Sequence, residues 1–336
     1  MESRRSHGMS EALRIHREAI VVDTHCDTLL RVLPPPGSGR RPIKLGERSD
    51  EGHIDLPRLR DGGVDCQVFA IYTGWRPNPP DALLRALQLI IAFERECDEN
   101  EDLVKAESYG DIMRAVEGGR IAGLLSLEGA EPLMGDPEMI RVFHRLGVRM
   151  ISLTWNWRNP FADGVAASRA ESRLTDLGLE AIGEMERLGI ILDVSHLSDS
   201  CFWDVAEVAG RPFIASHSNC RALCNHPRNL TDDMIRAIAD HGGVVGINFA
   251  PDFIHKEKAT LSRVVDHIDH VIEVAGIDHV GLGSDFDGIR STPEGLEDVS
   301  RLPGITEELL RRGYSEGEIR KILGENHLRV FREVIG

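Results

Sequence analysis

Side chains of the kinds that bind metal ions follow several short apolar segments of this 336-residue chain. They are His25, Asp27, Glu128, His196, His217 and Asp285. A lone histidine at a strand end is more often a hydrogen-bonded structural residue, and an Asp in a turn often bonds its own backbone. Here, however, such residues follow five of the eight predicted strands, all at the same end. This recurrence predicts a metal centre.

The types of these side chains limit which metal ion they would bind. Imidazole and carboxylate without thiolate suit zinc, with manganese, iron or cobalt as alternatives. Three histidines and two carboxylates exceed the three protein ligands that a single catalytic zinc usually takes. Two metals bridged by one carboxylate would use all five, and a hydroxide between them would be acidified and directed at a carbonyl carbon. The expected chemistry is hydrolysis.

Apolar, β-branched runs alternate with helical patterns along the chain. Strands are predicted at 20–25, 64–72, 121–127, 148–154, 190–196, 211–217, 243–249 and 279–284. Helices are predicted at 81–99, 137–146, 175–188, 199–209, 231–240 and 261–275. Nearly continuous apolar strands suit a parallel sheet that is buried on both faces. The pattern predicts the α/β class, as a closed (β/α)8 TIM barrel whose carboxyl-end face carries the catalytic residues.

Two further regions complete the predicted architecture. The tail at 305–335 reads as helix, with a capping box formed by Ser315 and Glu318. The segment 33–57 is rich in proline and glycine, so it is either a lid over the site or a plain surface excursion. Without a repeat or a clear linker, we expect one catalytic domain over 1–336 with a C-terminal helical extension.

Composition restricts the class of partner. The net charge of −16 argues against nucleic acid and against an anionic membrane surface. No stretch approaches the roughly 18 apolar residues of a membrane span, and the N-terminal segment lacks the apolar centre of a signal peptide. The six cysteines are scattered, so we expect free thiols and a cytoplasmic protein.

Longer motifs give a family resemblance. VDTHCD, SLEGAEP, LDVSHLS, IASHSNCRALCNHPRNLTDD and VGLGSDFDG occur in this order and at this spacing. With them the chain resembles the membrane (renal) dipeptidase family, peptidase family M19 of the amidohydrolase superfamily, from residue 20 onward. The resemblance implies a metal-dependent barrel hydrolase. The missing signal peptide and the ending FREVIG, without a hydrophobic extension, suggest a soluble bacterial-type relative, and the family often forms homodimers.

The resemblance also implies roles for the metal ligands. Two Zn²⁺ ions per chain would be bridged by Glu128 and a hydroxide. His25 and Asp27 would bind one zinc, and His196 and His217 would bind the other.

Two more residues acquire roles in the same way. Asp285 would accept the proton of the hydroxide and pass it to the leaving amine. Arg228, in HPRN, matches the arginine that binds the C-terminal carboxylate of the substrate. A planar guanidinium suits that task because it pairs with a carboxylate through two hydrogen bonds.

The segment LTWNWRNPFADG departs from the family pattern. Mammalian members carry a histidine in an LTH context where this chain has Trp155, whose indole cannot act as a general acid. Asn156 or Arg158 is the candidate replacement donor to the developing oxyanion; alternatively, Trp155 and Trp157 wall a different pocket. The aromatic hydroxyl of the family's strand-seven loop is absent from NFAPDFI.

The leading hypothesis is a binuclear zinc dipeptidase for dipeptides with a free C-terminal carboxylate, with a preference for a D-residue there left open. The first alternative is an N-acyl amino acid or other small-amide hydrolase on the same metal centre, motivated by Trp155. The second is a metal-binding pseudoenzyme, which is disfavoured because neither a ligand nor the proton shuttle is missing.

Overall fold

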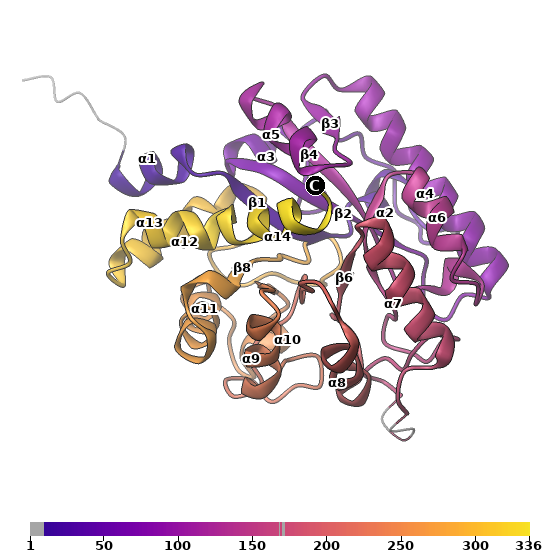
Figure 1. Cartoon of the computed structure of the whole chain (residues 1–336). Coiled ribbons are helices and arrows are strands. Elements are labelled where there is room, and N and C mark those ends of the chain that lie inside the picture. The colour runs from indigo at the N-terminus through magenta and orange to yellow at the C-terminus, as the bar shows by residue number, and fades with distance from the viewer. Residues whose placement is uncertain (1–9, 168, 170–171) are drawn as a thin grey trace, which may run out of the picture.

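Parallel strands curl into a ring that is surrounded by helices (Figure 1). The computed structural model describes residues 10–167, 169 and 172–336, so parts of the predicted 1–336 domain lie outside the described residues. The strands are β1 (Val21–Cys26), β2 (Val64–Tyr72), β3 (Leu103–Lys105), β4 (Ile121–Glu128), β5 (Val148–Ser152), β6 (Ile191–Asp193), β7 (Val245–Ile247) and β8 (Val280–Leu282).

The ring closes through a segment that is not a regular strand. The paired strands run in the order β6-β5-β4-β2-β1-β8-β7. Between the two ends of this series, Ile214 forms a parallel bridge to Asp193 of β6, and Ala215 forms one to Val245 of β7. The predicted strand at 211–217 is therefore reduced to these bridges, and it still fills the sixth place in a ring of eight segments. The predicted (β/α)8 class is confirmed.

β3 is an addition that the sequence analysis missed. It pairs with the first residues of β4, through Leu103 and Ile121, before β4 begins to pair with β5 at Leu125. It therefore lies beside the ring and not in it. Three residues are too few to show a hydrophobic period, which is why the pattern gave no signal.

Helices follow the strands as expected, and the predicted ones occur within two residues of their predicted ends. The helices are α1 (Glu11–Glu18), α2 (Leu29–Val32), α3 (Leu56–Asp61), α4 (Pro79–Glu99), α5 (Tyr109–Glu117), α6 (Met139–Arg145), α7 (Asp176–Leu188), α8 (Asp199–Val208), α9 (Asp232–Asp240), α10 (Pro251–Ile254), α11 (Leu261–Ala275), α12 (Pro303–Arg311), α13 (Glu316–Arg320) and α14 (Asn326–Val334). Short 3-10 turns are η1 (Glu131–Leu133), η2 (Ile277–His279) and η3 (Val299–Arg301), and η4 (Lys321–Glu325) is a π-helical turn. Caps such as Thr175 and Ser198 accept a backbone N–H and fix where helices begin.

The predicted helical tail closes the amino-terminal end of the ring. Ser315 and Glu318 form the expected capping box at the start of α13. In α14, Val330 and Phe331 are buried in one cluster with Val22 and Val244, which lie at or next to the starts of β1 and β7. Figure 1 shows α14 lying against the strands, with the C-terminus near the centre of the view. The carboxyl-terminal end of the ring is left for the site.

The segment 33–57 has no helix or strand before α3 begins. It is nevertheless packed, because Leu45 and Ile54 are fully buried and the Leu45 N–H donates to the Glu96 carboxylate at 2.9 Å. No helix among the described residues combines the length and the apolar character needed to cross a bilayer. All six cysteines are free.

Candidate metal centre

The six predicted side chains lie at the carboxyl-terminal ends of the barrel segments. They are His25, Asp27, Glu128, His196, His217 and Asp285, called the ligand cluster below. His25 and Glu128 belong to the last residues of β1 and β4, and Asp285 comes three residues after β8. Because parallel strands end on the same face of the ring, residues far apart in the sequence meet there. The structure brings all six predicted side chains together on this face.

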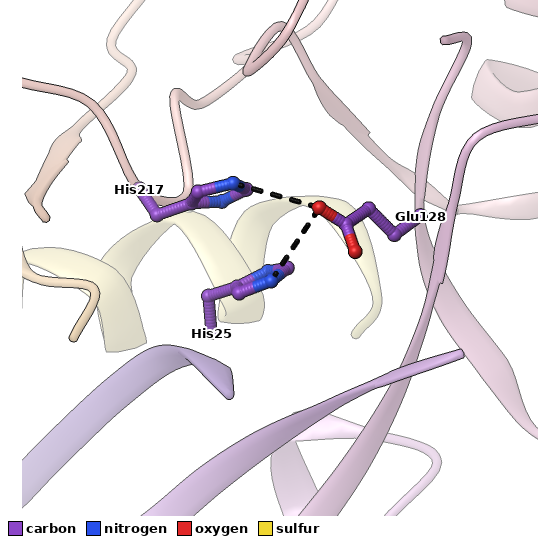
Figure 2. A group of neighbouring side chains, drawn as sticks. All are labelled: His25, Glu128 and His217. Atoms are coloured by element: carbon purple, nitrogen blue, oxygen red, sulfur yellow. Dashed lines mark ion pairs between the residues drawn. The ribbon is translucent and has the colours of Figure 1, made fainter. Parts of the chain in front are cut away.

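Glu128 lies at the centre of the ligand cluster. Its Oε1 is 3.0 Å from His196 Nε2 and 3.7 Å from the Nε2 atoms of both His25 and His217. Figure 2 shows the stacked rings of His25 and His217, both directed at this carboxylate. The Nε2 atoms of His196 and His217 are 2.8 Å apart. Three imidazoles therefore present Nε2 to one carboxylate oxygen.

A second group of ligand atoms overlaps with the first. One ligand atom from each of His25, Asp27 and Asp285 lies within 4.8 Å of the others, as do those of His25, Glu128 and His217. The Nε2 of His25 is 3.5 Å from Asp27 Oδ2. Two adjoining donor groups share His25, an arrangement with enough donors for two neighbouring cations.

The chemistry of these donors fits a divalent metal. His25 Nε2 and Asp27 Oδ1 are buried without a hydrogen-bond partner. Burial lowers the pKa of His25, but Glu128, Asp27 and Asp285 outweigh it and raise that pKa to about 10. The cluster thus attracts positive charge strongly. Buried carboxylates and unpartnered ring nitrogens are stabilised when a cation is coordinated.

Hydrogen bonds behind the ring nitrogens orient two of the imidazoles. The Oδ1 of Asn156 is 2.8 Å from His196 Nδ1, and the Oγ of Ser216 is 2.7 Å from His217 Nδ1. Ser216 in turn donates to Asp193 Oδ2 at 2.5 Å. With Nδ1 engaged, Nε2 is left to coordinate. Burial also lowers the pKa values of His196 and His217, which favours the neutral, ligating form.

Two members of the cluster hold an unusual backbone conformation. His196 has φ 72° and Asp285 has φ 61°. For residues other than glycine this left-handed region costs about 1–2 kcal/mol each. Such a strained conformation persists only where the surrounding contacts hold it in place, and it is most common at functional sites.

Asp285 is held by a residue that the sequence analysis missed. Asn248 Nδ2 donates to Asp285 Oδ2 at 2.9 Å and lies 3.4 Å from the carbonyl oxygen of His217. Burial, with Asp27 adding to it, raises the pKa of Asp285 to about 6. A polar residue near the end of the predicted strand 243–249 was the available signal for Asn248.

The cluster opens into a cavity of about 400 Å³, the metal-site cavity. Arg228 is buried in its wall, donates from Nη2 to the His217 carbonyl oxygen at 3.2 Å and has no partner for Nε. A buried guanidinium with an unused N–H is suited to bind an anion. The resemblance had implied this site for a substrate carboxylate.

Comparison with known proteins agrees with this geometry. The sequence profile of membrane dipeptidase (peptidase family M19) matches residues 9–335. The chain belongs to peptidase family M19. An uncharacterized dipeptidase of Schizosaccharomyces pombe is 38% identical over 95% of this chain and 81% of that protein.

Solved structures of the family superpose closely on this M19 chain. The crystal structure of dipeptidase AC, a metallopeptidase of family M19, has a TM-score of 0.87 at 31% identity and covers 95% of this chain and 99% of its own. A metallopeptidase of Rhodobacter sphaeroides, solved with a phosphinate mimic of L-Ala-D-Ala, has a TM-score of 0.83 at 30% identity over 94% and 99%. The predicted family, the amidohydrolase-type barrel and the metallo-dipeptidase class are confirmed.

In this M19 chain Trp155 forms a wall between two cavities. The centre of its ring lies 5.2 Å from that of Tyr72, 5.9 Å from that of Trp75 and 5.8 Å from that of His196. It lines both the metal-site cavity and a second cavity of about 660 Å³. This placement agrees with the alternative that the tryptophans wall a pocket. Asn156 also lines the metal-site cavity, although its Oδ1 is engaged by His196.

Arg158 is not brought to the ligand cluster. Its Nη2 donates to Asp163 Oδ2 at 2.9 Å, and it lines only the second cavity. The ion pair with Asp163 thus holds the Arg158 guanidinium outside the metal-site cavity. Tyr72, which the sequence had not singled out, supplies a different aromatic hydroxyl, since it ends β2 and lines the metal-site cavity. Burial raises the pKa of Tyr72, so its phenol stays a hydrogen-bond donor.

The segment 33–57 reaches this cavity. Arg40 lines it, and the His53 N–H donates to Asp287 Oδ1 at 2.8 Å. The other oxygen of Asp287 accepts from Thr28 Oγ1 at 2.7 Å. Asp287 therefore ties this segment to the residue next to Asp27. The segment forms part of the cavity rim, which is the position that a lid requires.

Proposed function

We propose that this M19 protein hydrolyses dipeptides that carry a free C-terminal carboxylate, with two zinc ions as cofactors. The observation that carries the proposal is the buried Arg228 guanidinium in the cavity that also contains the ligand cluster. A buried cation that can pair with a substrate anion supplies both affinity and orientation. The phosphinate mimic of L-Ala-D-Ala bound by the Rhodobacter sphaeroides relative supports a D-residue at the C-terminal position.

The residues fit two cations in the grouping that the resemblance implied. His25 and Asp27 would hold one zinc, His196 and His217 the other, and Glu128 would bridge them. Zinc bound there would supply Lewis acidity toward the scissile carbonyl and lower the pKa of water.

The chain itself supplies orientation and proton transfer. Arg228 binds the substrate carboxylate, and Trp155 and Tyr72 wall the other side of the cavity. Asp285, fixed by Asn248, takes the proton of the attacking water and delivers it to the leaving amine. A carboxylate whose pKa is raised toward neutrality is suited to accept and return a proton. Asn156 acts by positioning His196.

The substrate class is tested with matched compounds on zinc-loaded protein. Four Ala-Ala stereoisomers, the C-terminal amide of L-Ala-D-Ala and a set of N-acyl D- and L-amino acids are compared by kcat/KM. We expect turnover of L-Ala-D-Ala above the other isomers, and loss of turnover in the amide. Turnover of the acyl amino acids without any dipeptide turnover would instead establish the first alternative.

The pseudoenzyme alternative is disfavoured because the chain has all five side chains proposed as metal ligands, and Asp285 lies beside them.

Two further predictions remain part of the proposal. A homodimer is predicted from the family resemblance. Sedimentation equilibrium at several protein concentrations tests it by measuring the molar mass in solution. A cytoplasmic location is predicted from the composition, and fractionation of the source cells tests it.

A further inference from the structure

The second cavity contains a carboxylate that the proposed chemistry does not use. Glu131 lines this cavity together with Trp155 and Trp157. Trp155 also lines the metal-site cavity, so the two cavities adjoin at this ring. Glu131 is partly exposed, as a residue in a cavity wall must be. A ligand that extends from the metal-site cavity past the edge of the Trp155 ring would meet Glu131.

Glu131 lies close to the ligand cluster, three residues after Glu128. A Cβ atom built on Gly129 would lie 2.4 Å from Glu131 Oε2 and 3.2 Å from the Trp155 backbone nitrogen. The carboxylate is thus enclosed between the residues that follow β4 and β5. The charge of Glu131 also contributes to the raised pKa of Tyr72, whose ring lines the metal-site cavity.

No cation of the described residues neutralises Glu131. Asn159 Nδ2 donates to Glu131 Oε1 through a long contact of 3.3 Å, and the backbone N–H of Glu131 itself also bonds to this carboxylate. Burial raises the pKa of Glu131, and no arginine is among the groups that act on it. Three described arginines line the same cavity. Arg158 is paired with Asp163, the Arg76 guanidinium lies 3.6 Å from the centre of the Trp157 ring, and Arg169 forms no ion pair with Glu131 within the described part of the chain. A partly buried carboxylate without a counter-charge is stabilised by an incoming cation.

The order of segments places Tyr72 opposite the segment that precedes Arg228, and Glu131 follows the segment next to that of Tyr72. Arg228 follows the bridged segment at 214–215, the sixth of the eight ring segments. Tyr72 ends the second segment, and Glu131 follows the third. In a closed ring of eight, the sixth segment faces the second. A substrate whose carboxylate is on Arg228 and whose carbonyl is at the ligand cluster extends its N-terminal residue toward Tyr72 and Glu131.

We propose that Glu131 binds the free α-ammonium group of the substrate and thereby selects dipeptides over N-acylated amino acids. This inference rests on the proposed dipeptidase function and makes it more specific. An ammonium group matches the missing counter-charge, whereas an acyl chain would leave the carboxylate unpaired and desolvated. A site built for a polar group rejects the analogue that lacks it.

The test compares L-Ala-D-Ala with N-propionyl-D-Ala, which differs only in lacking the α-amino group. For the wild type we expect a clear preference for the dipeptide in kcat/KM. In Glu131→Gln the dipeptide should lose about 10- to 100-fold, the scale of one hydrogen bond to a charged group, while the propionyl compound changes little. Glu131→Asp should recover part of the preference. Glu138→Gln, at an exposed position just before α6, is the matched control and should behave as the wild type.

A binding measurement gives a second readout. Calorimetry on the wild type compares the phosphinate mimic of L-Ala-D-Ala with its desamino counterpart, and the amino compound should bind more tightly. Equal affinities would overturn the role of Glu131 even if Glu131→Gln failed to fold. A wild type that prefers propionyl-D-Ala contradicts the dipeptidase proposal itself. A wild type that prefers the dipeptide, with an unchanged preference or an equal loss on both compounds in Glu131→Gln, contradicts only the inference about Glu131.

Discussion

At the scale of single residues, Asp285 combines three properties of a proton carrier. It lies within the ligand cluster, one oxygen is fixed by Asn248, and burial of its carboxylate raises its pKa to about 6. Its backbone is left-handed, and its carboxylate lies within 4.8 Å of ligand atoms of His25 and Asp27. No other carboxylate of the cluster has an amide donor that holds it in this way among the described residues.

Replacing Asp285 with Asn therefore tests the proton-transfer role. We expect kcat for L-Ala-D-Ala to fall about 10²- to 10⁴-fold, because an amide cannot accept and return a proton. Zinc per chain, measured by mass spectrometry, should stay near two. Asp98→Asn, on the exposed face of α4, is the control. Unchanged turnover would remove Asp285 from the mechanism.

Arg228 is expected to act on binding. In Arg228→Lys the KM for L-Ala-D-Ala should rise about 10- to 100-fold with a smaller change in kcat, since lysine lacks the planar pair of N–H donors. Steady-state kinetics on the dipeptide and on its C-terminal amide measure the effect. The variant should also lose the discrimination between the two compounds. Retention of that discrimination would show that the carboxylate binds elsewhere; Arg145→Lys, at an exposed position on α6, is the control.

At the scale of elements, the start of β2 contains a buried carboxylate, Asp65, whose ionised form destabilises the folded protein. The Asp65 carboxylate accepts the Val21 N–H at 2.8 Å, and burial raises its pKa to about 6. The folded-state pKa lies above the ordinary value, so the folded protein holds this proton more tightly. The contribution of Asp65 to stability is therefore greatest below about pH 4 and is lost as pH rises to about 6.

Asp65→Asn should accordingly raise stability at neutral pH. The amide oxygen can still accept the Val21 N–H and carries no charge to desolvate. We expect a gain of about 1–3 kcal/mol in the free energy of unfolding at pH 8, which disappears below pH 4. Urea unfolding at several pH values measures it. A gain that is independent of pH would contradict the electrostatic explanation.

The C-terminal helix α14 is expected to be essential for barrel stability. Phe331 is fully buried in the cluster that closes the amino-terminal end of the ring. Phe331→Ala should cost about 3–5 kcal/mol through lost burial and a cavity, and Phe331→Leu should cost less. Denaturant unfolding distinguishes them. A cost below 1 kcal/mol for the alanine variant would show that α14 is not part of the cooperative fold.

The same elements show what sequence could predict. Long amphipathic helices such as α4 and α11 were located to within two residues, because their period repeats over several turns. The segment at 211–217 was predicted as a strand, yet only Ile214 and Ala215 bridge its neighbours. Backbone pairing depends on the position of the neighbouring segments, and the apolar residues of one segment do not show that position.

At the site, residue type and strand position were enough to predict which six side chains lie together. The partners behind them did not follow from sequence, since Asn248 and Tyr72 take their roles only from spatial proximity to Asp285 and Trp155. Arg158 shows the opposite case: its motif position favoured substrate binding, but Asp163 engages it outside the metal-site cavity. The sequence does not show whether the guanidinium pairs with a substrate or with a nearby carboxylate of the chain.

At the scale of the whole molecule, the metal centre is a product of barrel closure. The six side chains of the ligand cluster come from five barrel segments between residues 25 and 285, and no single segment holds more than two of them. Such a site does not exist in the unfolded chain, so metal binding is linked to folding. The acidic composition of the chain adds a net charge of −16, which attracts cations generally.

Zinc titration of metal-free protein tests the central proposal most directly. Protein stripped with a chelator is titrated with Zn²⁺, and hydrolysis of L-Ala-D-Ala is followed against the zinc content of each sample. We expect no activity without metal and a plateau of activity at two zinc ions per chain, and we expect this plateau to be lost in His217→Ala. Full activity in the metal-free protein, or no hydrolysis of any dipeptide at two zinc ions per chain, would contradict it.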